Sequence, residues 1–282
     1  MGKTLERQAL DCIGKDWSKS SATREKLLAN VGDFTRFVQD KFGLERIINL
    51  KPGHVEAYAQ NLQQRGLSAS DRANKMTAVR QVADSIGKQN IVARKNKEYG
   101  IERVRINPQP VNSEKLDVIR GKLRDKADRG DKIALMMITA DMLRKAFGLR
   151  AKESLMSKDV TEESGKLFLV VEGAKGGRPR SLEVKNDAQL CAVQQVKETS
   201  RLVGSGTGRI IPPNMTLKQA YDAQRNEWRT LGGTRAAEAN MHGERHSVAR
   251  ELNAAGVPKT EIMRELGHGE KRSPAAYLGK NS

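Results

Sequence analysis

Hydrophobic residues recur at intervals of three and four over much of the chain, the spacing of one face of an α-helix. In the first third this pattern and its cap residues predict three helices, at 21–43, 52–64 and 68–86. The apolar face of the first should comprise Leu27, Leu28, Val31, Phe34, Phe37, Val38 and Phe42. Residues 1–20 are weakly patterned, and a basic segment at 91–104 predicts a fourth helix. We expect a small helical bundle.

The helical pattern breaks at residues 107–112, which read Asn-Pro-Gln-Pro-Val-Asn. The two prolines disfavour a helix and favour an extended connector. We therefore predict a helical domain at 1–106, a linker at 107–112 and a second domain at 113–282. A chain of 282 residues is long enough for two domains with separate cores.

The second domain opens with a helix that Asn112 or Ser113 would cap. The next predicted helix, at 132–147, is apolar on most sides, so we expect it to be the buried centre of the domain. Gly148 should end that helix, and a short helix carrying Glu153 should follow.

One region has the pattern of β-strands. Residues 166–171 form a predicted strand, 173–177 a turn, and 180–184 the returning strand of a hairpin. Helices resume near Asp187, and one of them opens with a capping box that starts at Thr216. The predicted fold class is mainly α with a small antiparallel β-sheet.

Composition narrows the class of partner. The chain has 51 Lys and Arg against 34 Asp and Glu, a net charge of +17. Such an excess favours a polyanionic partner, because each neutralised phosphate releases condensed counterions. Aromatic residues are 4% of the chain, which argues against a single-strand binder that stacks bases on aromatic rings. Net charge by itself does not exclude a ribosomal or a membrane-surface protein.

The cysteines and the apolar runs indicate in which cellular compartment the protein is expected. Cys12 and Cys191 match no metal or redox spacing and are expected to be reduced. The apolar run at 133–138 is too short to span a membrane, and the N-terminus lacks the apolar core of a signal peptide. We expect a cytoplasmic protein with no membrane partner.

Side chains suited to phosphoryl transfer gather near the C-terminal end. His242 and His268 are imidazoles, which move protons near neutral pH. Arg245 supplies a guanidinium that can fork onto a phosphate. Tyr277 offers a phenolic oxygen as nucleophile. Together they are the groups needed for a phosphoryl transfer in which the protein is the first acceptor.

Two further cations are candidates for the same chemistry. The sequence has neither an acidic cluster that suggests a metal cage nor a phosphate-binding glycine loop, so fixed cations would neutralise the phosphate. Arg150, just after the predicted central helix, is one such cation. Lys175, between glycines of the predicted turn, could protonate a leaving alkoxide.

In their order along the chain these residues resemble the motifs of the tyrosine recombinase (integrase) family. The matching segments are Gly148-Leu149-Arg150 with Glu153, residues 173–180 around Lys175, His242-Gly243-Glu244-Arg245, Leu266-Gly267-His268, and Tyr277. Any one of these motifs is weak evidence for the family, whereas five motifs in the expected order and with suitable spacing are specific evidence. Residues 65–86 also resemble the family's core-binding domain.

The resemblance implies strand transfer through a covalent intermediate. Tyr277 would attack the scissile phosphate, leaving a 3′-phosphotyrosine and a free 5′-hydroxyl. Lys175 would act as general acid on the 5′-oxygen, and His242 would handle the tyrosine proton. Because the phosphotyrosine conserves the bond energy, the implied reaction needs no ATP, no metal and no other cofactor.

The resemblance also assigns the residues that hold the phosphate. Arg150 and Arg245 would clamp the non-bridging oxygens, with His268 as a further donor, and Glu153 would hold the first arginine in place. One feature departs from the family, since only residues 278–282 follow the tyrosine. Family members usually carry a further C-terminal helix that docks on a neighbouring protomer, so we expect a different coupling between protomers or a shortened chain.

The implied partner is double-stranded DNA that carries a specific recombination site. A helical core-binding domain and a catalytic domain would close around the duplex as a C-shaped clamp. The resemblance implies a homotetramer on two duplexes, with accessory DNA-bending proteins as further partners. Such a protein would be associated with the nucleoid and would serve a phage or mobile element, or resolve chromosome dimers.

Three other interpretations remain open from the residues. His242, His246 and His268 could approach one zinc ion, although Arg245 among them would repel the metal. Residues 256–268 resemble part of a helix-turn-helix, which would suit a non-catalytic DNA-binding regulator. A type IB topoisomerase shares the proposed chemistry but relaxes supercoils, whereas the helical N-terminal domain favours a recombinase.

Overall fold

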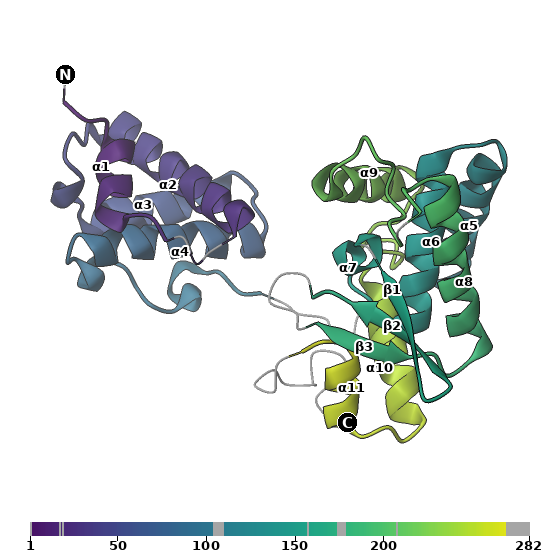
Figure 1. Cartoon of the computed structure of the whole chain (residues 1–282). Coiled ribbons are helices and arrows are strands. Elements are labelled where there is room, and N and C mark those ends of the chain that lie inside the picture. Colours follow the sequence, from purple (N-terminus) through teal and green to yellow (C-terminus); the bar gives the residue numbers. More distant parts are fainter. Residues whose placement is uncertain are drawn as a thin grey trace. The chain divides into compact units, whose positions relative to one another are not determined.

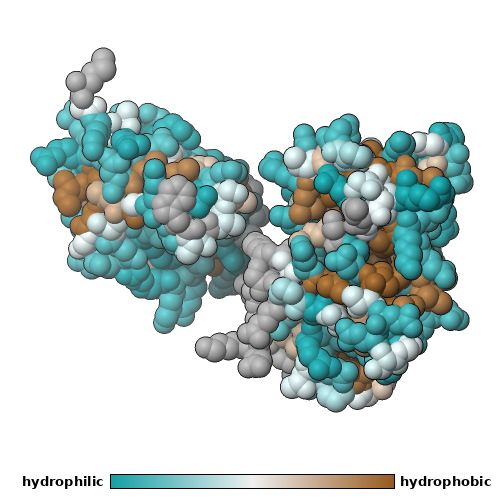
Figure 2. Space-filling model, in the orientation of Figure 1, coloured by the Kyte–Doolittle hydropathy of each residue, from teal (hydrophilic) through white to brown (hydrophobic). Residues whose placement is uncertain are grey.

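The computed structural model describes residues 2–16, 18, 20–103, 110–156, 158–173, 179–206 and 208–268. The chain divides into two compact units, Met1–Arg105 and Ile106–Ser282 (Figure 1). On the face shown in Figure 2, hydrophilic residues cover most of each unit. In the described part of the chain, no helix has the length and apolar character needed to cross a membrane.

The first unit is a helical bundle. Its elements are α1 (Leu5–Ile13), α2 (Ser21–Phe42), α3 (Pro52–Gln64), α4 (Ala69–Ser85) and the short 3₁₀ turns η1 (Ile47–Asn49), η2 (Gln89–Ile91) and η3 (Asn96–Tyr99). The helices α2, α3 and α4 lie where the apolar pattern predicts them. The helix α1 was not predicted, because only Leu5 and Ala9 of it are buried.

The predicted fourth helix at 91–104 is wrong over its described part, which forms the turns η2 and η3. Contacts with other residues hold this segment out of a helix. Arg80 Nε donates to the carbonyl of Ala93 at 2.9 Å, and the Ala93 amide donates to the Tyr99 hydroxyl at 2.8 Å. Backbone groups bonded in this way are not available for a helical ladder.

The core of the first unit forms where α2 meets α3 and α4. Phe34 of α2 packs edge-on against Tyr58 of α3, with ring centroids 5.0 Å apart. The Tyr58 hydroxyl donates to Asp33 at 2.6 Å, so the polar end of this buried ring is satisfied. The predicted apolar face of α2 was too wide, because Leu28 and Phe42 are exposed.

The second unit is built around α6 (Lys132–Phe147). Its remaining helices are α5 (Ser113–Asp128), α7 (Ala151–Leu155), α8 (Asp187–Leu202), α9 (Leu217–Thr230), α10 (Gly243–Ala254) and α11 (Lys259–Glu265). The helix α6 packs against α5, α7, α8, α9 and α10, which confirms it as the buried centre (Figure 1). Asp131 caps its first turn and Gly148, with φ of 61°, ends it as predicted.

A three-stranded antiparallel sheet completes this unit. Its strands are β1 (Asp159–Glu163), β2 (Lys166–Val171) and β3 (Arg180–Glu183), in the order β1-β2-β3. The β2–β3 pair was predicted, and residues 174–177 of the predicted turn lie outside the described residues. The edge strand β1 was not predicted, because its sequence Asp-Val-Thr-Glu-Glu is mostly polar. The fold class, mainly α with a small antiparallel sheet, is confirmed.

Candidate active site

The left-handed turn at Gly148 presents the first arginine motif. Two residues after Gly148, Arg150 is the N-cap residue of the short helix α7. The Arg150 amide donates to Glu153 Oε2 at 3.0 Å, and Arg150 Nη1 donates to Glu153 Oε1 at 2.5 Å. The Glu153 side chain is fully buried, whereas 21% of the Arg150 side chain is exposed. Glu153 therefore holds Arg150 in one orientation while leaving part of its guanidinium accessible.

The second arginine reaches the same place from α10. Arg245 has a fully buried side chain whose Nη1 lies 3.9 Å from Glu153 Oε2. Its guanidinium also donates to the carbonyls of Gly148, at 2.6 Å, and Leu266. Arg245 thereby joins the ends of α6 and α11 to its own helix.

His268 completes the described part of the cluster. Its Nε2 lies 3.0 Å from Arg245 Nη2, and its backbone amide donates to the carbonyl of Met263 at 2.9 Å. The structure thus brings four sequence-predicted residues together from three distant segments: Arg150, Glu153, Arg245 and His268.

The two other histidines lie at the start of α10. His242 is the N-cap residue of this helix, and its ring centroid is 5.1 Å from that of His246. Removal of water from the His242 ring, together with the charges of Arg245 and Arg150, lowers its pKa to about 4. Burial and the neighbouring His242 lower the pKa of His246 to about 4 as well. A His242 imidazole that is neutral near pH 7 is able to accept a proton.

Glu153 is the electrostatic centre of the site. Burial by itself raises the pKa of a carboxyl group, but the charges of Arg180 and Arg150 and the Arg150 amide bond reverse this effect. The resulting pKa of Glu153 is about 2. Its carboxylate is therefore ionised at neutral pH and serves as counterion to several guanidiniums at once.

Two cations of this cluster were not found by sequence reasoning. Arg180, at the start of β3, lies with Nη2 3.2 Å from Glu153 Oε2. Lys158 is almost fully buried, and its ammonium donates to the carbonyls of Glu153 and, at 2.5 Å, of Met156. Nothing in their spacing distinguishes these two residues from surface cations, so only the fold reveals them.

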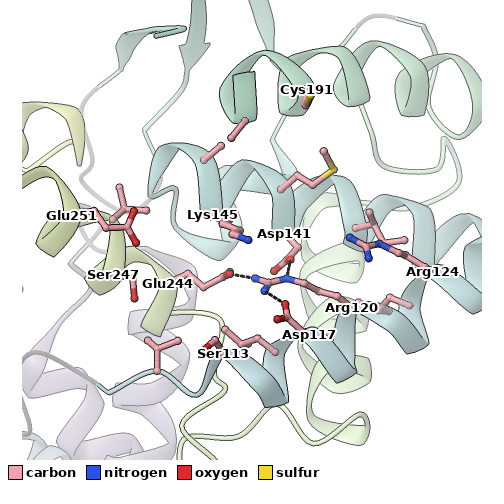
Figure 3. Close-up of a pocket in the computed structure, with 18 of the residues that line it drawn as sticks. Ser113, Asp117, Arg120, Arg124, Asp141, Lys145, Cys191, Glu244, Ser247 and Glu251 are labelled. Atoms are coloured by element: carbon pink, nitrogen blue, oxygen red, sulfur yellow. Dashed lines mark hydrogen bonds and ion pairs between the residues drawn. The ribbon is translucent and has the colours of Figure 1, made fainter. Parts of the chain in front are cut away.

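A second ionic network lies behind the histidine–arginine motif. Arg120 of α5 contacts Glu244 of α10, Asp141 of α6 at 2.7 Å and Asp117 at 2.9 Å (Figure 3). Asp141 also pairs with Arg144 at 2.8 Å. Asp117, Arg120, Asp141 and Glu244 border a cavity of about 540 Å³ between α5, α6, α8 and α10. The network ties the first turn of α10 to the central helix.

Two predicted site residues, Lys175 and Tyr277, lie outside the described residues. Their roles stay predictions. Among the residues that the structure describes, no group of three His, Cys, Asp or Glu side chains is arranged to hold a metal ion. The arrangement of His242, His246 and His268 is thus not that of a zinc site.

Comparison with known protein families gives two matches. Residues 111–251, half of the chain, match the family described as integrase. Residues 4–92 match the family described as phage integrase, N-terminal. A search of curated proteins gave no match.

Solved structures show the same fold. The XerH site-specific recombinase bound to palindromic difH substrate, a post-cleavage complex, is 20% identical with a TM-score of 0.65, over 90% of this chain and 75% of that chain. A lambda integrase tetramer bound to a Holliday junction is 13% identical with a TM-score of 0.68, over 99% and 77%. The Tn1549 transposon integrase in complex with transposon right end DNA is 15% identical with a TM-score of 0.60, over 99% and 96%.

These matches bear on the alternatives left open by the sequence. The integrase match spans the central helix, both arginines and the sheet, which a helix-turn-helix regulator would not need. Neither the regulator nor the topoisomerase interpretation is favoured. With the integrase match over residues 111–251 and the phage integrase match over 4–92, the chain belongs to the integrase family of tyrosine site-specific recombinases.

Proposed function

We propose that this recombinase cuts and rejoins duplex DNA through a 3′-phosphotyrosine formed on Tyr277, without ATP or metal. The observation that supports this most strongly is the convergence of Arg150, Arg245 and His268 around the buried carboxylate of Glu153. Donors held in this way before substrate arrives stabilise the charge that develops on a phosphate in the transition state.

The proposed step conserves the phosphodiester bond energy. The phenolic oxygen of Tyr277 forms a bond to phosphorus, and the bond between phosphorus and the 5′-oxygen breaks. His242 takes the phenol proton, which suits an imidazole that is neutral at physiological pH. Lys175 gives a proton to the departing 5′-oxygen. Attack by another 5′-hydroxyl reverses the same step and rejoins the strands.

The cations of the cluster have different parts in this proposal. Arg150, with 21% of its side chain exposed, is the guanidinium that can reach a non-bridging oxygen directly. Arg245 has no exposed side-chain surface, and its bonds to Gly148 and Leu266 fix it as a positive charge beside His268. Together with His268, the two guanidiniums replace the divalent ion used by most phosphoryl-transfer enzymes.

The proposed partner is double-stranded DNA bearing a specific recombination site. A net charge of +17 supports a polyanionic partner. We assign core binding to residues 1–106, a linker to 107–112 and catalysis to 113–282. The lambda integrase of similar fold is a tetramer bound to a Holliday junction, which supports a homotetramer on two duplexes. Accessory DNA-bending proteins are further proposed partners, on the family resemblance alone.

A suicide substrate tests the proposed function. Duplexes from the DNA that flanks the gene are nicked close to the candidate site, so that the released strand diffuses away and the covalent complex accumulates. We expect an SDS-stable protein–DNA adduct whose attached nucleotide carries a 3′-phosphate. Tyr277→Phe should abolish the adduct, whereas Tyr221→Phe, on α9, should retain it. An adduct that persists in Tyr277→Phe would remove Tyr277 from the role of nucleophile.

A further inference from the structure

The guanidinium of Arg120 links three helices of the second unit behind the arginine cluster. Its Nε donates to Asp141 of α6 at 2.7 Å, and its Nη1 donates to Asp117 of its own helix at 2.9 Å. Its Nη2 donates to Glu244 in the first turn of α10 (Figure 3). Only 12% of the Arg120 side chain is exposed. One nearly buried side chain therefore holds α5, α6 and α10 together.

The central helix supplies a second cation to the carboxyl group of Glu244. Arg144, which has no exposed side-chain surface, lies with Nε 3.7 Å from Glu244 Oε2. Its Nη2 also donates to Asp141 at 2.8 Å, so both arginines share both carboxyl groups. The carbonyl of Arg144 accepts a bond from the amide of Gly148 at 2.9 Å. Glu244 is thus held by α5 and by the last turn of α6.

The position of Glu244 in the sequence gives these contacts their consequence. Glu244 directly precedes Arg245, and consecutive side chains of a helix point about 100° apart. The two residues therefore leave α10 in different directions. Arg245 Nη1 donates to the carbonyl of Gly148 at 2.6 Å, at the same end of α6 that carries Arg144. The first turn of α10 is thus fastened to one end of the central helix from two sides, and a shift of this turn would move Arg245.

We propose that Arg120 is a positioning residue for strand cleavage, which acts through Glu244 to hold the positive charge of Arg245 in its place beside Glu153. This inference rests on the proposed function, because it gives Arg245 a part in neutralising the scissile phosphate. Arg120 does not touch the DNA in this proposal. It acts through its bonds to Glu244 and Asp141, which fix the first turn of α10 against α5 and α6.

The test compares two duplexes that differ at the mapped cleavage position. One has the natural scissile phosphate, and the other has a methylphosphonate, in which a methyl group replaces one non-bridging oxygen and removes the negative charge. Cleavage of the uncharged linkage depends less on fixed cations, because less negative charge has to be stabilised in the transition state. The ratio of the methylphosphonate rate to the phosphate rate, measured in single turnover, therefore reports how well the cations are placed. This ratio is independent of the fraction of folded protein.

Arg120→Met removes all three bonds, and Arg120→Lys keeps the charge but lacks the fork that reaches separate acceptors. We expect both variants to cleave the phosphate duplex about 100-fold more slowly than the unsubstituted protein, because a misplacement of about 1 Å is enough for such a loss. On the methylphosphonate duplex the defect should shrink at least about tenfold, as it should in Arg150→Met, which removes a cation of the cluster itself. Arg124→Met, at an exposed position one turn further along α5, is the matched control and should leave the ratio unchanged.

Two results would count against the inference in different ways. If Arg150→Met raises the ratio but either Arg120 variant leaves it unchanged, Arg120 does not position the charge of Arg245, and the proposed function stands. If the unsubstituted protein forms no adduct with the phosphate duplex, the proposed function fails and the inference fails with it. A raised ratio in both Arg120 variants, with the ratio of Arg124→Met unchanged, supports the proposal.

Discussion

Glu153 Oε2 and Arg245 Nη1 lie 3.9 Å apart, and both side chains are fully buried, although the two residues belong to separate motifs of the chain. The same carboxylate also contacts Arg150 and Arg180. Glu153 thus has a wider role than the expected support of one arginine. It is the shared counterion that allows the buried guanidiniums of Arg245 and Arg180 to lie beside the partly exposed guanidinium of Arg150.

The first prediction concerns this counterion. Glu153→Gln keeps the size of the side chain but leaves three buried or half-buried guanidiniums without their common carboxylate. Removal of one partner of a buried ionic cluster typically costs about 3–5 kcal/mol. We expect a loss of that order in the free energy of unfolding, measured by urea denaturation at pH 7, together with loss of the covalent DNA adduct. Glu198→Gln, half-exposed on α8, is the control and should change stability by less than about 0.5 kcal/mol.

The second prediction concerns the turn before His268. Gly267 and Gly256 both end helices with left-handed φ, 63° and 78°, so alanine is strained at either position. Only at Gly267 would the new Cβ meet another group, Arg180 Nη1 at 2.5 Å, whereas at Gly256 nothing lies within 4 Å. We expect Gly267→Ala to lower the free energy of unfolding by about 1–3 kcal/mol more than Gly256→Ala does. Equal losses in urea denaturation would contradict the packing argument.

The third prediction concerns the buried lysine. Burial lowers the pKa of Lys158 from its ordinary value of 10.5 to about 7. Between these two values the unfolded chain holds a proton that the folded chain has released, so this residue makes stability rise with pH across that window. We expect the free energy of unfolding of Lys158→Met to lack that rise. Between pH 7 and 9.5 the unsubstituted protein should therefore gain about 2–3 kcal/mol of stability relative to the variant.

Urea denaturation of both proteins at several pH values measures this difference. Lys218→Met, an exposed lysine on α9, is the control and should follow the unsubstituted protein. Parallel stability curves for Lys158→Met and the unsubstituted protein would show that the ammonium of Lys158 has an ordinary pKa.

The fourth prediction concerns the network behind α10. Burial, and next the charge of Asp141, raise the pKa of Glu244 to about 8. The folded chain therefore holds a proton that the unfolded chain releases above about pH 4.5, so this group makes stability fall as pH rises toward 8. Glu244→Gln should remove that fall, so its stability relative to the unsubstituted protein should improve from pH 5 to pH 8.5. Thermal denaturation across this range tests it, with Asp222→Asn, on α9, as control.

Much of the fold could be predicted because its signals are local. The apolar positions and caps of α6, with Asp131 before it and Gly148 after it, specify a buried helix without reference to other segments. The apolar run at 167–171 and the returning segment at 180–184, separated by glycines, likewise predict the β2–β3 pair. The errors arose where contacts with other segments of the chain set the local structure. The polar strand β1 exists because it pairs with β2. Residues 91–103 are kept out of a helix by the bond that Arg80 donates to the Ala93 carbonyl and by the bond that the Ala93 amide donates to the Tyr99 hydroxyl.

The residues of the candidate site likewise divide into those that the sequence predicted and those that it did not. The order of the motifs indicated Arg150, Glu153, Arg245 and His268, and the structure brings these four together. Spacing along the chain carried no sign of Arg180 or Lys158, which resemble any other cation until their neighbours are known.

The sequence by itself therefore determined most of the helices, the β2–β3 pair, the preference for a polyanion and the chemical groups of the proposed reaction. Caps, periodicity and net charge are properties of single segments or of the whole composition, and they do not depend on the fold. Only the tertiary structure decided which cations share Glu153, because an ionic contact depends on distance and on the exclusion of water. Both are set when α6, α7, α10, α11 and β3 pack together.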